Sequence, residues 1–136
     1  MTDVPYVSFR LNKLIRDKAP ERFGKKGHTV HYRKISGNDL EDALLQKLLE
    51  EADEVKNAKT RQDRTEELGD LLEVIDALVQ FWDLSREEID AAKKIKKNEL
   101  GGFEGGFFGT HCDIPTHDEA YVAALRAQPH KYPEIK

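Results

Sequence analysis

Apolar residues recur every three or four positions through the middle of the chain, which is the spacing of one face of an α-helix. The pattern predicts a first long helix that begins near Asn38. Asn38 can cap this helix, and Glu41 follows three residues later, which is the arrangement of a capping box. The apolar face of the helix is formed by Leu40, Leu44, Leu48, Ala52 and Val55.

A second long helix is predicted over residues 61–82, and it carries two apolar strips. One strip consists of Leu68, Leu71, Leu72, Ile75, Leu78, Val79 and Trp82, and the other of Val74, Ala77 and Phe81. A helix that is apolar on two sides is expected to be covered on both, as in a bundle that continues across a subunit interface. We therefore expect an all-α fold, a bundle of antiparallel helices completed by oligomerisation.

Shorter elements are predicted on either side of this pair. A short helix is expected over residues 19–25, and residues 28–35 alternate loosely, as in a short strand or an irregular arm. A third helix is predicted to start at Ser85, where Glu88 completes another capping box. A helical piece is expected around residues 118–128.

Composition and charge narrow the class of protein. The length of 136 residues suits one domain, which we assign to residues 1–110, with residues 111–136 as a tail that packs on it or extends from it. The net charge of −4 argues against a nucleic-acid polymer as partner. One cysteine, Cys112, suits a reducing cytoplasm. No apolar run approaches the roughly 20 residues that span a membrane, and no export pattern opens the chain, so we expect a cytoplasmic protein.

An acidic array on the two long helices is the feature most suggestive of chemistry. The first helix carries Glu50, Glu51, Asp53 and Glu54, and the second carries Glu67 and Asp70. Written as a pattern, this is E-E-x-x-E, then twelve residues, then E-x-x-D. Carboxylates three or four positions apart share one face of a helix, and here they border the apolar face instead of opposing it.

Nearby basic residues do not balance these carboxylates, because residues 48–55 hold four acids and no base. Salt bridges between positions i and i+4 are therefore not expected to explain them. Packing several carboxylates together without a cation costs several kcal/mol in repulsion and desolvation. A pocket made only of oxygens suits a hard divalent cation, so we expect Mg²⁺, with Mn²⁺ as a substitute.

The motifs around the array resemble those of the all-α nucleoside triphosphate pyrophosphohydrolases, the MazG-like superfamily. The sequence similarity lies in residues 49–52 (LEEA) and 66–72 (EELGDLL). Residues 11–20 (LNKLIRDKAP) resemble the NKLVRDKIP opening of a branch labelled phosphoribosyl-ATP pyrophosphohydrolase-like. Residues 101–104 (GGFE) resemble the RGGF element of that branch, so the resemblance covers roughly residues 9–105.

The resemblance implies a helical-bundle subunit that forms a homodimer or homotetramer and requires Mg²⁺. It implies cleavage of a small-molecule nucleoside triphosphate between the α and β phosphates, giving a monophosphate and pyrophosphate, as in the removal of non-canonical nucleotides. The family's metal ligands match Glu51, Glu54, Glu67 and Asp70, and a further carboxylate that helps to hold metal or activate water matches Glu50. The chain departs from the branch at Leu100, where Arg is usual, and at Gly105-Gly106, which replace a basic residue.

The pyrophosphate leaving group needs positive charge beyond that of a metal. The first candidates to bind it are Lys13, Arg16 and Lys18, and the second are Lys93 and Lys97. Lys93 and Lys97 have an alternative interpretation, because cations in the last turns of a helix interact favourably with its dipole. Lys13 and Arg16 could equally be surface charges of an N-terminal arm.

Three alternatives stay open. A phosphoribosyl-ATP pyrophosphohydrolase of histidine biosynthesis would run the same reaction on a different substrate. A non-catalytic helical oligomerisation module would carry the acids as a solvated surface. A di-iron carboxylate bundle normally needs Glu-x-x-His motifs, and the predicted long helices hold no histidine.

Overall fold

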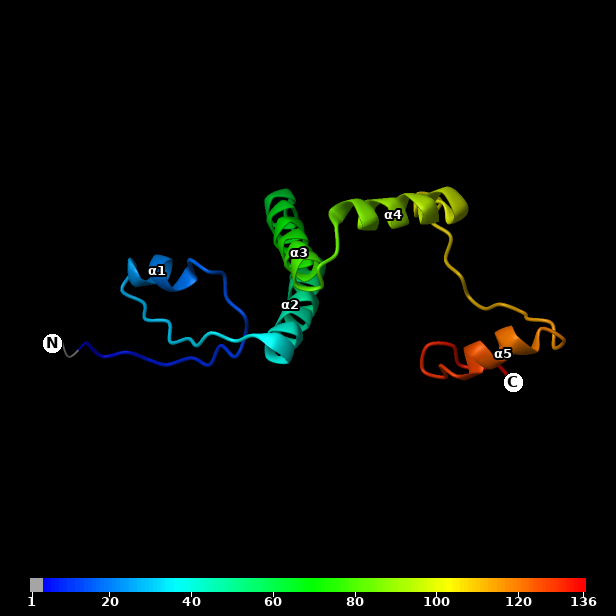
Figure 1. Ribbon diagram of the computed structural model, residues 1–136, viewed down its shortest axis with the longest axis horizontal. Coiled ribbons are helices and arrows are strands. Elements are labelled where there is room, and N and C mark those ends of the chain that lie inside the picture. Colours follow the sequence, from blue (N-terminus) through cyan, green and yellow to red (C-terminus); the bar gives the residue numbers. More distant parts are fainter. Residues whose placement is uncertain (1–3) are drawn as a thin grey trace. The chain divides into compact units, whose positions relative to one another are not determined.

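The computed structural model describes residues 4–136, and the regular secondary structure over that range is entirely helical. Figure 1 shows the order of the helices along the chain. They are α1 (Ala19–Gly24), α2 (Gly37–Asn57), α3 (Arg61–Phe81), α4 (Arg86–Leu100) and α5 (Glu119–Arg126). The all-α prediction is therefore confirmed. Residues 28–35 form no strand and are an irregular arm.

Packing divides the chain into two compact units, and the division falls inside α4. The first unit runs to Ile95 and contains the acidic array, and the second is Lys96–Lys136. In the second unit, Arg126 Nε lies 2.6 Å from Glu134 Oε1, which ties the end of the chain to α5. The domain boundary expected at residue 110 stays a prediction, because compact units need not coincide with domains.

Helices α2 and α3 form an antiparallel hairpin joined by residues 58–60, and they pack along each other (Figure 1). Their contacts run in opposite order along the two helices. Trp82, just after α3, donates an indole N–H to Glu41 in the first turns of α2. Glu51, in the second half of α2, lies beside Asp70 in the first half of α3. Acids from both helices are thus brought to one level of the hairpin.

The core of the first unit is small and lies between α2 and α3. Leu44, Val74 and Leu78 are buried, and both apolar strips of α3 contribute to it. Partly buried side chains surround them: Leu14, Leu40, Leu45, Leu48, Ala77 and Phe81. Leu68 and Leu72 of α3 each keep 49% of their surface exposed. The first strip is therefore only partly covered by this chain, and its covering by a second subunit stays a prediction.

The starts of the helices test the predicted capping residues. Ser36, with an extended backbone, occupies the N-cap position of α2, and Asn38 lies inside the first turn. The capping role of Asn38 was therefore wrong, because Gly37 at φ +59° turns the chain into the helix earlier. The capping box before α4 is confirmed: Glu88 N–H donates to Ser85 Oγ, and Ser85 N–H donates to Glu88 Oε2, each at 3.1 Å.

The remaining helices follow their predictions closely. α1 lies within residues 19–25, with a proline in its first turn, and α5 lies within residues 118–128. Within residues 4–136, none of the helices combines the length and apolar character needed to cross a membrane.

Candidate functional site

Three of the predicted acids meet across the α2–α3 hairpin. Glu51 comes from α2, and Glu67 and Asp70 come from neighbouring turns of α3. Each offers one carboxylate oxygen, and the three oxygens lie within 4.8 Å of one another. Glu51 is buried, whereas Glu67 and Asp70 are half-buried. We call these three residues the acidic triad. Carboxylates from both long helices therefore converge at these three positions.

Glu54 stands at the rim of the acidic triad. It is exposed on α2 and is not among the three mutually close groups, but its charge acts on Glu67. Partial burial raises the pKa of Glu67, and the negative charges of Asp70, Glu54 and Glu51 raise it further. The neighbouring carboxylates thus disfavour the ionised form of Glu67.

Glu50 faces basic groups instead. Its Oε1 atom lies 3.1 Å from Lys13 Nζ and 3.5 Å from Lys47 Nζ. Burial pushes the pKa of Glu50 up, but the hydrogen bond from Lys13 and the charge of Lys47 outweigh it, so the pKa lies below its ordinary value. Glu50 is therefore held ionised at neutral pH.

Lys47 corrects the expectation that helical salt bridges play no part in the array. Its Nζ atom lies 3.5 Å from both Glu50 Oε1 and Glu51 Oε1, as an i,i+3 pair and an i,i+4 pair. The expectation was wrong because it considered only residues 48–55, and Lys47 directly precedes that range. Lys47 is well covered, with 17% of its side chain exposed, and it links the predicted catalytic carboxylate to the acidic triad.

Two of the predicted phosphate-binding cations reach the array from the segment before α1. Arg16 Nη2 lies 2.8 Å from Asp70 Oδ1, and Lys13 pairs with Glu50. The segment is turned at Asn12, which has φ +46°, a conformation that asparagine tolerates better than most residues. The N-terminal segment thus lies against both long helices at the level of the acids.

The other three predicted cations are exposed side chains. Lys18 precedes α1 and Lys93 lies on α4, and both are exposed. Within residues 4–136, neither forms an ion pair. Lys97 belongs to the second compact unit and lies in the last turn of α4, where the helix-dipole interpretation applies.

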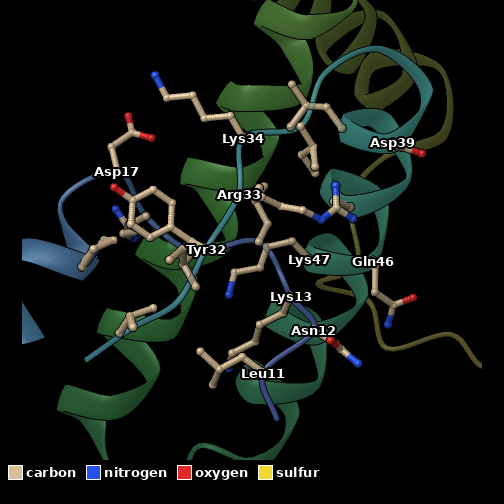
Figure 2. Close-up of a pocket in the computed structure, with 18 of the residues that line it drawn as sticks. Leu11, Asn12, Lys13, Asp17, Tyr32, Arg33, Lys34, Asp39, Gln46 and Lys47 are labelled. Atoms are coloured by element: carbon tan, nitrogen blue, oxygen red, sulfur yellow. The ribbon is translucent and has the colours of Figure 1, made fainter. Parts of the chain in front are cut away.

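A pocket of about 960 Å³ opens between the N-terminal segment, the arm over residues 30–35 and the first half of α2. Its basic lining residues are Lys13, Arg16, Arg33, Lys34 and Lys47. Figure 2 shows Arg33 reaching from the arm towards α2, and Lys47 reaching from α2 into the space between them. Within the described residues, Arg33 and Lys34 form no ion pair. Arg33 therefore directs a positive charge toward a pocket whose lining also holds acids, namely Asp17, Glu21, Asp39, Asp42 and Glu50.

Sequence reasoning missed Lys47, Arg33 and Lys34 as site residues. Lys47 could have been found, because it stands three and four positions before two of the acids. Arg33 and Lys34 carried no signal, since nothing in the loose alternation of residues 28–35 indicates that the arm folds back along α2.

The donor set of the acidic triad fits a hard divalent cation. All three groups are carboxylates, which are preferred by Mg²⁺. Opposite oxygens around an octahedral Mg²⁺ are roughly 4.2 Å apart, from bonds of about 2.1 Å each. Adjacent oxygens around the same ion are roughly 3.0 Å apart. The triad oxygens, which lie within 4.8 Å of one another, must therefore draw closer together to share one ion. A dication would also relieve the mutual repulsion that raises the pKa of Glu67.

Comparison of the chain with family models, with curated proteins and with solved structures gives no match. The resemblance to the MazG-like superfamily therefore stays a prediction that rests on the motifs themselves.

Proposed function

We propose that the protein is a Mg²⁺-dependent nucleoside triphosphate pyrophosphohydrolase that cleaves the bond between the α and β phosphates. The products are a nucleoside monophosphate and pyrophosphate, and removal of non-canonical nucleotides is the role this reaction suits. The observation that carries the proposal is the acidic triad with Arg16 directly beside it at 2.8 Å from Asp70. Oxygen ligands for a dication and a cation for phosphate thus occur in one place.

The acidic triad, with Glu54 at its rim, is the proposed metal site. A Mg²⁺ ion held by these residues would supply positive charge that favours departure of the pyrophosphate. Lys13 and Arg16 add the charge that the metal does not provide. A guanidinium can donate two parallel hydrogen bonds to a phosphate, which orients the substrate as well as attracting it.

Glu50 is proposed to orient the attacking water. Its lowered pKa keeps it ionised, so it can accept a hydrogen bond from a water molecule at neutral pH. A carboxylate held by two lysines is a weak base. We therefore assign Glu50 the alignment of the water with the α phosphorus, and not the storage of its proton.

The pocket beside the array is the proposed nucleotide site. Its volume of about 960 Å³ lies within the range of small-molecule sites. Its wall is mixed: the basic residues are accompanied by apolar ones and by acids. The apolar ones are Leu11, Leu14, Ile15, Val30, Ile35 and Leu40, and the acids are Asp17, Glu21, Asp39, Asp42 and Glu50. The basic part suits phosphates, and the apolar part, with Tyr32 at 65% exposure, suits a sugar and base.

Assembly and location complete the proposal. A homodimer or homotetramer would cover the exposed part of the α3 strip at Leu68 and Leu72. A reducing cytoplasm suits Cys112, which is exposed and unpaired.

The test is Mg²⁺-dependent release of pyrophosphate from a panel of canonical, deaminated and oxidised nucleoside triphosphates and phosphoribosyl-ATP. The expected result is a monophosphate and pyrophosphate in equal amounts. Asp70→Asn should lower kcat/KM by about 100-fold or more, because even changes around metal ligands cost about 10–100-fold. Asp53→Asn is the matched control, since Asp53 is an exposed acid of α2 outside the triad.

Three results would contradict the proposal. Release of orthophosphate with a nucleoside diphosphate would mean a different bond is cleaved. Full activity of Asp70→Asn would mean that the triad holds no catalytic metal. Absence of both hydrolysis and Mg²⁺ binding would favour the non-catalytic oligomerisation module.

A further inference from the structure

The Arg16–Asp70 ion pair joins a predicted phosphate ligand to a predicted metal ligand. Arg16 Nη2 and Asp70 Oδ1 are 2.8 Å apart, and Asp70 contributes to the acidic triad. A guanidinium at this distance would repel a dication bound by the same carboxylate, because like charges a few Å apart interact strongly near a protein surface. Arg16 and a metal therefore compete for Asp70.

We propose that Arg16 is a counter-ion of Asp70 that is exchanged for the metal, and that it moves to the substrate phosphates when metal and substrate bind together. The inference rests on the proposed function, because it takes the acidic triad as the metal site. It adds that the N-terminal segment couples metal binding to phosphate binding.

The surroundings of Arg16 permit this exchange. Its side chain is 61% exposed and that of Asp70 is 42% exposed, so the pair is of the solvated kind that contributes little to stability. Arg16 comes from a segment without regular secondary structure and also lines the pocket. It can leave Asp70 by side-chain rotation and still face a ligand in that pocket.

Glu50 has two cationic partners, Lys13 and Lys47, where Asp70 has Arg16. Lys13 is 42% exposed and comes from the same irregular segment as Arg16, whereas Lys47 is 17% exposed and is fixed on α2. Lys47 remains as an ion-pair partner of Glu50 when Lys13 turns to a phosphate. The cations of the segment are therefore the exchangeable ones, and the cation of α2 is the stationary one.

The exchange has an energetic consequence for the two ligands. A metal that binds alone must displace Arg16 without offering it a new partner. A metal that binds with a triphosphate offers the displaced guanidinium a phosphate. Each ligand therefore strengthens the binding of the other, and this coupling must be reciprocal.

The experiment compares the full-length protein with Arg16→Met, which removes the charge and keeps most of the length. Calorimetry first measures the affinity for Mg²⁺ alone. It then measures the affinity for the Mg²⁺ complex of a nucleoside triphosphate with a methylene bridge between the α and β phosphates. Arg22→Met is the matched control, because Arg22 is an exposed arginine of α1 that forms no ion pair within residues 4–136.

The expected changes have opposite signs. Arg16→Met should bind Mg²⁺ alone more tightly, by about 5-fold or more, which is the lower end of common coupling between sites. The same variant should bind the metal–nucleotide complex more weakly, by about 10-fold, because a charge-assisted bond to phosphate is lost. Arg22→Met should match the wild-type protein in both measurements.

Other outcomes overturn the inference in distinguishable ways. Weaker or unchanged Mg²⁺ binding by Arg16→Met, with normal binding by the wild type, would show that Arg16 does not compete with the metal. Tighter binding of both ligands would show that Arg16 only repels the metal and does not move to phosphate. No Mg²⁺ binding by any form would remove the metal site, and the proposed function would fail together with the exchange.

Discussion

The indole nitrogen of Trp82 donates a hydrogen bond of 3.0 Å to Glu41 Oε2, and this contact joins the end of α3 to the start of α2. It closes the open end of the hairpin, opposite the turn at residues 58–60. The acidic triad lies between these two ends, so its geometry depends on both being held.

Trp82→Phe should lower the stability of the protein by about 1 kcal/mol, because it removes this hydrogen bond and keeps an aromatic ring. Chemical denaturation followed by circular dichroism measures the change. Glu41→Gln keeps an acceptor oxygen and should have a smaller effect. Equal stability of Trp82→Phe and the wild type would mean that the contact does not hold the hairpin.

Substitution of two leucines of α3 distinguishes packing inside the subunit from packing between subunits. Leu78 is buried, so Leu78→Ala should lower the free energy of unfolding by about 2–5 kcal/mol. Leu72 is 49% exposed in the single chain, so Leu72→Ala should have a much smaller effect if the protein is a monomer.

If a second subunit covers the strip, Leu72→Ala should instead weaken association. Light scattering during size-exclusion chromatography, run over a range of protein concentrations, measures this change. An unaltered oligomeric state of Leu72→Ala would contradict a subunit interface at this position.

The helices, and the approach of the acids on α2 to those on α3, could be predicted because both depend on residues close together in the sequence. Helical periodicity is written in neighbouring residues, and a short link forces consecutive helices to run antiparallel. Residues equally far from such a turn then face one another: Glu51 and Glu67 each stand eight positions from residue 59. The acidic triad was predictable from these two facts.

The basic side of the site was not predictable in the same way. Arg33 is brought to the pocket by an arm with no regular structure, so no periodicity marks its position. Lys13 and Arg16 were predicted because a leaving pyrophosphate needs positive charge, and no periodicity indicated where they would lie. Their contacts with Glu50 and Asp70 span 37 and 54 positions in the sequence, and only tertiary packing brings them together.

Glu67 should make the metal-free protein less stable as the pH rises. Its pKa is raised in the folded state, so its protonated form is favoured by folding. The stability it contributes is complete below the ordinary glutamate pKa of about 4.3 and is lost as the pH rises through the raised pKa. At neutral pH without metal, Glu67→Gln should therefore raise the melting temperature, and Mg²⁺ should stabilise this variant less than the wild type.

Thermal melts with and without Mg²⁺, at neutral pH and at a pH below the ordinary glutamate pKa, measure these changes in melting temperature. Glu66→Gln is the control, because Glu66 is exposed, adjacent and outside the triad. A lower melting temperature for metal-free Glu67→Gln at neutral pH would show that the crowding of charge is not destabilising.

Lys47 should set the acid limb of the activity profile. The pKa of Glu50 is lowered by Lys13 and Lys47 against the effect of burial, so loss of Lys47 leaves burial less opposed and raises that pKa. Activity needs ionised Glu50 in the proposed mechanism, so kcat/KM of Lys47→Met should begin to fall at a higher pH than in the wild type. Rates measured from below the ordinary glutamate pKa of about 4.3 up to neutral pH record the shift. Lys56→Met is the control, because Lys56 is an exposed lysine in the last turn of α2. An acid limb at the same pH in Lys47→Met and the wild type would contradict the role of Lys47 in holding Glu50 ionised.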